Sequence, residues 1–176
     1  MKALTLYQPW AQLVAIGAKR IETRSWGTSY RGPLAIHAGK AMKTEAMRLI
    51  LINPFRTCIG QNKLSFGCIV ATCELVDVMQ VGEWDASGIE IDYFNQGHRW
   101  SLTHQEQAFG NYAIGRYMWF LDNIKILPEL IPAKGAQRLW EWKIPEPKLT
   151  IFNKDGSKTE VTPLKIWDPG ELSDTL

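Results

Sequence analysis

The chain has 176 residues, of which 45% are hydrophobic and 22% are charged, as expected for one globular domain or one domain with an appendage. This composition argues against disordered and fibrous classes. No apolar stretch approaches the ~18 residues of a membrane span, and the first residues lack a signal peptide's apolar core. We expect a cytoplasmic protein without a membrane segment. The three cysteines lack zinc-site spacing, so we expect neither a metal nor another cofactor.

The near-neutral balance of 20 Lys and Arg against 18 Asp and Glu conceals an uneven distribution. Residues 1–60 carry nine of the bases and two of the acids, and the chain has an unusual eight tryptophans. A basic segment with interleaved aromatic residues suits a nucleotide or nucleic-acid site, because cations bind phosphate and flat rings stack on bases. The alternative is a solvated basic face with core aromatic residues, and charge alone favours this alternative.

Hydrophobic periodicity predicts the elements of the first half of the chain. From Pro9 the apolar positions recur at helical spacing until Gly17 ends the helix. Runs rich in β-branched residues predict strands. The predicted elements are a strand 2–7, a helix 9–16, a short strand 19–24, a loop 25–32, a strand 33–38, a helix 41–52 and a strand 66–78.

The second half of the chain reads as strands around one helical turn. Residues 82–100 read as a polar connection, and Thr103 and Glu106 have the spacing of a capping box. The predicted elements are a helical turn 103–109, strands 117–121 and 124–126, an extended segment 128–132 and an aromatic turn 135–142. Together these elements predict an α+β domain built on a small, mostly antiparallel β-barrel with flanking helices.

The C-terminal region differs in character from the rest. Pro145 and Pro147 mark a linker, and Asp155-Gly156 predicts a hairpin loop between arms 149–152 and 160–163. We therefore divide the chain into a domain of residues 1–145 and an appended β-hairpin with a C-terminal tail, residues 146–176.

The densest polar constellation lies in residues 17–26. If residues 20–24 form a strand, Arg20, Glu22 and Arg24 project from one face and Thr23 from the other. A carboxylate between two guanidinium groups stays ionised and orients them, as a binding site requires. The alternative, an exposed ion network on an edge strand, is equally compatible with the pattern.

Five further residues are candidates for chemistry, although each alone is better explained structurally. Gln8 can read the polar edge of a base or can cap the helix that places Trp10 in the core. His37 is an acid–base group or a core residue, and Lys40 a phosphate ligand or a surface lysine. Glu106 belongs to a loop over a site or to a solvated turn. The chain lacks P-loop, GxGxxG and GxSxG motifs, which argues against the corresponding chemistries.

The segment LYQPWA at residues 6–11, followed by Gly17, Lys19, Glu22 and Arg24, resembles the ASCH (activating signal cointegrator homology) domain family, whose hallmark is a GxKxxExR motif. Later stretches are similar to bacterial and phage members of that family; they are residues 30–38, 109–112 with 115–117, and 135–140. The resemblance covers about residues 3–142 and excludes the tail. It implies a PUA-like β-barrel that binds RNA or a nucleotide derivative in a cleft beside the first helix.

The resemblance also assigns positions within that cleft. The implied floor is Lys19, Glu22 and Arg24, the rim is Gln8, Trp10 and Trp26, and the neighbouring wall is His37 and Lys40. The favoured hypothesis is binding of RNA or a modified nucleoside. In it Arg24 and Lys40 meet phosphate, the two tryptophans stack on bases, and Gln8 and Glu22 read polar edges.

Two alternatives stay open. Some ASCH-like proteins are amidohydrolases that deacetylate acetylated cytidine with a Lys, a Thr three residues later and a distant Glu, and others are described as ribonucleases. The corresponding catalytic candidates here are Lys19, Thr23 and Glu106, but Glu22 stands where that pattern has its Thr. The other alternative is a protein-interaction module in transcription control, with the C-terminal hairpin contacting a protein partner. The sequence leaves the oligomeric state open.

Overall fold

The structure is a computed structural model that describes the chain except for residues 96, 146–148, 153–154 and 162–176. It divides into two compact units, Met1–Trp142 and Lys143–Leu176, which are described separately. The predicted tail and the end of the second hairpin arm lie outside the described residues. Among the helices of the described part, none has the length and apolar character needed to cross a membrane.

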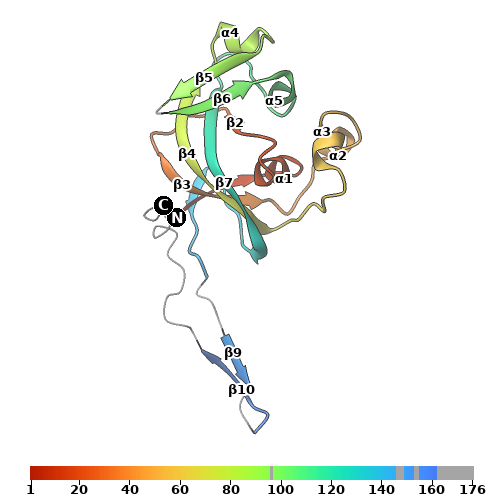
Figure 1. Ribbon diagram of the computed structural model, residues 1–176, viewed down its shortest axis with the longest axis vertical. Coiled ribbons are helices and arrows are strands. Elements are labelled where there is room, and N and C mark those ends of the chain that lie inside the picture. The colour runs from red at the N-terminus through yellow and green to blue at the C-terminus, as the bar shows by residue number, and fades with distance from the viewer. Residues whose placement is uncertain (96, 146–148, 153–154, 162–176) are drawn as a thin grey trace. The chain divides into compact units, whose positions relative to one another are not determined.

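The first unit is built on one curled sheet (Figure 1). Its described strands are β1 (Lys2–Leu6), β2 (Ile21–Arg24), β3 (Gly32–Ala38), β4 (Cys68–Gln80), β7 (Tyr117–Pro132) and β8 (Leu139–Glu141), in the order β2-β7-β4-β3-β1-β8. β1 and β3 pair in parallel, and the other neighbours pair antiparallel. Register shifts interrupt the long β4–β7 ladder at three places. Such bulges bend strands, which lets the sheet curl into a half-barrel.

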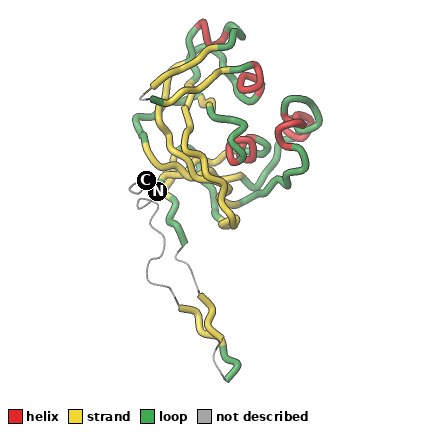
Figure 2. The backbone as a smooth tube through the Cα atoms, in the orientation of Figure 1, coloured by secondary structure: helices red, strands yellow, loops and turns green. Residues whose placement is uncertain are grey.

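The core lies between this sheet and α1 (Trp10–Ala15). Five of the six residues of α1 are buried, because this short helix packs on the sheet on one side and on another apolar cluster on the other. Ala11 and Val14 pack with side chains of β1, β3, β4 and β7, and Leu13 packs against Phe55 and Phe109 on the other side. Figure 2 shows the short helices mostly to one side of the curled strands. The predicted α+β class, with a mostly antiparallel barrel-like sheet and flanking helices, is confirmed.

The predicted helix 41–52 is shorter than expected and is followed by a second helix. The structure has α2 (Thr44–Leu49) and then α3 (Phe55–Ile59). α2 therefore ends at Leu49, before the predicted boundary at Asn53-Pro54, and Pro54 instead precedes α3, since a proline is well tolerated where a helix begins. Phe55 and Ile59, one turn apart, are buried in the same cluster as Leu13, and this burial stabilises α3.

The prediction that residues 82–100 form only a polar connection is wrong. The segment contains α4 (Glu83–Ala86), β5 (Ile91–Asn95) and the start of β6 (His98–Leu102), and β5 and β6 form an antiparallel hairpin. Trp100 and Leu102 alternate inward along β6 and pack with Phe120 of β7. Their polar neighbours face outward, so the segment has the alternation of a half-buried strand, which the prediction of a polar connection overlooked.

Three further elements differ in detail from prediction. β7 continues through Asp122-Asn123 as one strand, because Asn123 adopts a φ of 50° where the register shifts and Asn tolerates this conformation. The aromatic turn contains the short β8. In the second unit, β9 (Leu149–Phe152) pairs with β10 (Lys158–Val161), so the second arm begins two residues earlier than predicted.

Candidate functional site

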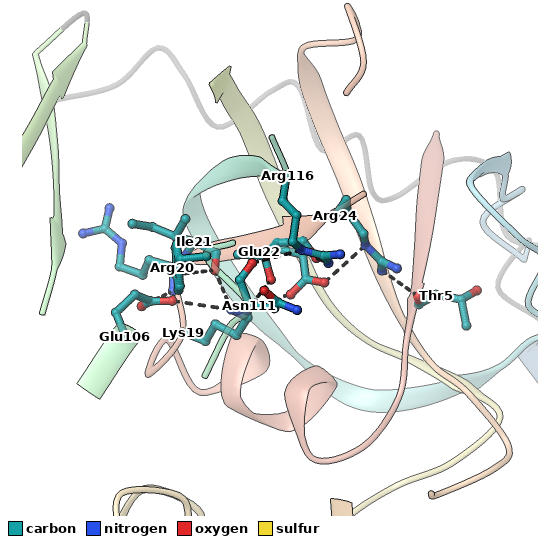
Figure 3. A network of polar contacts seen from close by, with 11 residues as sticks. Thr5, Lys19, Arg20, Ile21, Glu22, Arg24, Glu106, Asn111 and Arg116 are labelled. Carbon is teal, nitrogen blue, oxygen red and sulfur yellow. Dashed lines mark hydrogen bonds and ion pairs between the residues drawn. The ribbon is translucent and has the colours of Figure 1, made fainter. Parts of the chain in front are cut away.

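The open side of the curled sheet contains a cavity of about 430 Å³, here called the first cavity. Its lining comes from β1, β2, the start of α1 and the loop before β8. β1 and β2 are separated by three strands in the sheet order, so only the curl brings them to the same cavity. Figure 3 shows Arg24 of β2 reaching across to Thr5 of β1.

Glu22 and Arg24 lie on the face of β2 that meets this cavity. The Arg24 Nη2 donates a hydrogen bond of 2.9 Å to the main-chain oxygen of Thr5. Its Nε lies 3.2 Å from the Glu22 Oε1 as an ion pair without hydrogen-bond alignment, which leaves this buried N–H unsatisfied in the described part of the chain. The alternation of side chains along β2 therefore presents one carboxylate and one guanidinium side by side.

Lys19 lies beneath these residues and has no exposed surface. Its Nζ donates to the main-chain oxygen of Ile21 and lies 3.6 Å from both the Glu22 Oε2 and the Glu106 Oε1 (Figure 3). An ammonium group without solvent needs such partners, because an uncompensated buried charge costs several kcal/mol. Lys19 thus orients Glu22 from below and is not among the residues lining the first cavity.

Glu106 closes the outer edge of β2. Its two carboxylate oxygens accept the main-chain N–H groups of Arg20, at 2.9 Å, and Ile21, at 3.1 Å. Glu106 follows Thr103, whose hydroxyl accepts the Glu106 N–H and caps α5 (His104–Ala108) as predicted. The carboxylate of a capping box would return to Thr103, but here it turns to β2. Burial raises the pKa of the Glu106 carboxyl, although Lys19 and the two N–H donors act in the opposite direction.

The predicted orientation of Arg20 is wrong, and of the three catalytic candidates the structure brings Lys19 and Glu106 together but not Thr23. Arg20 precedes β2 and pairs with Asp122 at 2.8 Å, away from Glu22. The Thr23 hydroxyl accepts the Asn111 N–H at 2.9 Å, and no described contact joins it to Lys19. A threonine nucleophile activated by Lys19 therefore has no counterpart in the geometry of the described residues.

Of the three predicted rim residues, two line the first cavity. Trp26 packs edge-on against Trp119 with ring centroids 4.7 Å apart, and Trp10 packs edge-on against Phe55. Gln8 does not belong to the rim. It is fully buried, with its amide nitrogen donating to the Ser65 oxygen and its amide oxygen accepting the Gln12 N–H.

His37 and Lys40 line a second cavity of about 780 Å³, together with Lys134 and the loop 135–137. This cavity shares Thr5, Tyr7, Ala136 and Gln137 with the first. The His37 Nε2 contacts the Ala133 oxygen at 3.1 Å and must donate to it, because a carbonyl only accepts. In the neutral ring Nδ1 is therefore an acceptor, buried and without a partner in the described residues. Burial lowers the pKa of His37, Ala133 opposes this effect, and the nearby Lys40 lowers it further.

A third cavity of about 430 Å³ lies on the other side of Glu22 and Trp10, which it shares with the first. Lys43, Thr23 and Arg116 contribute to its lining. The three cavities thus contain one carboxylate, Glu22, against several basic side chains. These are Arg24 and Arg138 in the first, Lys40 and Lys134 in the second, and Lys43 and Arg116 in the third.

Four of these basic residues and one aromatic residue, Tyr7, were not among the site residues predicted from the sequence. The four basic residues are Lys43, Arg116, Lys134 and Arg138. Arg138 lies over the Trp26 ring, 5.6 Å from its centroid, and adopts a φ of 57°, which is uncommon for arginine. Tyr7 lies in the LYQPWA segment but was not singled out. Arg116 and Arg138 lie within two of the stretches that resemble the family, 115–117 and 135–140, and this resemblance was the available signal; Lys43 and Lys134 had none. Within the described residues no group of His, Cys, Asp and Glu is placed to hold a metal ion.

The curled, mostly antiparallel sheet with short flanking helices is the architecture of a PUA-like β-barrel domain. The family model for the ASCH domain matches residues 4–119, more than half of the chain, and the chain belongs to this family. It is similar to Activating signal cointegrator 1 from Homo sapiens, at 33% identity over 81 residues, and from Mus musculus, at 34% over 82. Each similarity covers 43% of this chain and only 14% of the relative.

Proposed function

We propose that this protein binds RNA in the first cavity and its two neighbours. The observation that carries the proposal is the supply of basic side chains without carboxylate partners. Among the described residues, the bases lining the second and third cavities form no ion pair with a carboxylate, and neither does Arg138. Unpaired cations at a surface concentrate phosphate groups, and the adjoining aromatic rings can stack on bases.

The family membership adds to this proposal, because RNA binding is the usual inference for ASCH domains. A single modified nucleoside is the smaller ligand that the first cavity would accept by the same chemistry. Hydrolysis has less support. Lys19 lies between the carboxylates of Glu22 and Glu106, and the Thr23 hydroxyl accepts a hydrogen bond from the Asn111 N–H and has no described contact with Lys19. We therefore assign Lys19 and Glu106 the role of positioning β2, and Glu22 and Arg24 the role of meeting the ligand.

The test is a titration of fluorescently labelled RNA at several salt concentrations, read as anisotropy. Arg24→Ala and Lys40→Ala should each weaken binding and reduce the slope of log K against log salt by about 0.7, the value for one contact to single-stranded phosphate. Lys125→Ala, at an exposed position on β7 outside the three cavities, is the matched control. Circular dichroism should confirm that each variant is folded. Unchanged affinity and slope in both test variants would refute the proposal.

A further inference from the structure

Resting on the proposed RNA binding, we infer that the ligand is a single-stranded oligonucleotide that spans all three cavities and that Tyr7 stacks on a base at their junction. Tyr7 lines the first, second and third cavities. It lies between β1 and α1, and 47% of its surface is exposed. Buried aromatic rings contribute to the core, but an exposed ring shared by three basic cavities is placed for contact with a ligand.

The basic side chains divide between the cavities in a way that suits successive phosphates. Lys40 and Lys134 are exposed in the second cavity, and Arg138 is exposed in the first. In the third, the Lys43 Nζ lies 5.1 Å from the centroid of the Tyr7 ring. A chain of nucleotides that passes Tyr7 would therefore meet cations on both sides of this ring.

The aromatic residues favour a single strand over a duplex. Bases in a duplex are already paired and stacked, so side-chain rings reach them only in single-stranded segments. Tyr7 and Trp10 separate the first cavity from the third, and Trp26 lines the first. Rings of this kind bind single strands with little sequence preference, because every base offers a flat face.

A lone nucleoside would not use most of this arrangement. It carries no phosphate, so it would leave the cations of the second and third cavities without a partner. It would also fill the first cavity alone, and Tyr7 would contact it only at one border. The length of the ligand is therefore the property that separates this inference from the binding of a single nucleoside.

The experiment measures the affinity of the full chain for uridine, for UMP and for oligouridylates of two to eight nucleotides. Affinity should rise with length over the first few nucleotides and then level off. Tyr7→Ala should weaken binding of the longest oligonucleotide by between about 5- and 150-fold, the range for losing one stacked base. Tyr7→Phe keeps the ring and should bind like the unmodified chain. The double variant Lys40→Ala/Lys134→Ala should reduce the salt slope for the longest oligonucleotide by about 1.4, twice the value per contact.

The outcomes separate the inference from the function on which it rests. If UMP binds as tightly as the longest oligonucleotide, or if Tyr7→Ala binds normally, the inference is wrong even when Arg24→Ala weakens binding. A duplex of mixed sequence that binds as tightly as its separated strand would also overturn it. If no ligand of any length binds, the proposed function itself is wrong.

Discussion

The Arg24 guanidinium donates to the main-chain oxygen of Thr5 at 2.9 Å and so connects β2 to β1 across the open side of the curled sheet. The two strands are not neighbours in the sheet order. Arg24 also forms an ion pair with Glu22, so a single side chain reaches from the carboxylate on β2 to the main chain of β1. A planar, forked group can make both contacts at once, whereas an ammonium group is a compact point charge.

Replacing Arg24 by lysine should therefore destabilise the fold as well as weaken RNA binding. The loss of a charged hydrogen bond predicts a decrease of about 1.5–3 kcal/mol in the free energy of unfolding. Urea unfolding followed by circular dichroism would measure it. Arg48→Lys, at an exposed position on α2, is the matched control and should change little. Equal stability of the two variants would contradict the bridging role.

Lys19→Met tests whether the motif lysine is structural. The substitution removes the positive charge between two buried carboxylates and should lower the free energy of unfolding by about 3–5 kcal/mol. Lys40→Met, at an exposed position, is the control for changing lysine to methionine. A Lys19→Met protein of normal stability that had lost only an activity would instead indicate a catalytic lysine.

Gly135→Ala tests how closely the loop before β8 packs on His37. A Cβ atom at this position would lie 2.4 Å from both the Nδ1 and the Cε1 of His37 and 2.8 Å from the Thr5 Oγ1. The imidazole ring is buried and cannot move aside freely, so we expect a loss of about 1–3 kcal/mol in thermal or urea unfolding. Gly82→Ala has room for its Cβ and serves as the control. If the Gly135 variant is no less stable than this control, the packing is looser than described.

The lowered pKa of His37 predicts a pH dependence of stability. Its folded-state pKa lies below the ordinary value of 6.5, so the unfolded chain binds the proton more tightly. The contribution of His37 to stability is therefore present above about pH 6.5 and is lost as the pH falls toward the folded-state pKa. His37→Gln should flatten the decline of the free energy of unfolding below pH 6.5, measured by urea unfolding at a series of pH values. Identical pH profiles of His37→Gln and the unmodified chain would show that His37 does not titrate as described.

Local pattern predicted much of the fold and the centre of the candidate site. Helical spacing after Pro9, the apolar strand around residue 70 and the alternation of Glu22 with Arg24 are all properties of neighbouring residues. The hairpin β5–β6 was missed because its outward polar residues resemble those of a connecting loop, although its inward residues pack with Phe120 of β7. Burial of Gln8 and Lys19 likewise depends on residues far along the chain, such as Ser65 and Glu106. No spacing rule links such pairs in advance.

The sequence indicated only part of the clustering of Lys and Arg side chains around the cavities. The basic residues 1–60 include Arg24, Lys40 and Lys43, which line the three cavities, although charge alone favoured a solvated basic face. Lys134 and Arg138 lie in the half of the chain that is richer in acids, and the curl of the sheet brings them beside β1. Charge along the sequence therefore underestimates charge around a cavity whenever distant loops meet there.

The outer edge of β2 has a consequence for self-association. Unpaired N–H and C=O groups on an edge strand can pair with a strand of another chain. Here Glu106 occupies the Ile21 N–H, and Lys19 and Tyr112 occupy the Ile21 oxygen. The side chains of the ASCH motif and of α5 thus act as a substitute for a further strand. A chain without Glu106 would leave the main-chain N–H groups of Arg20 and Ile21 unpaired at the edge of the sheet. We expect such a chain to aggregate by pairing this edge with strands of other chains before it unfolds completely.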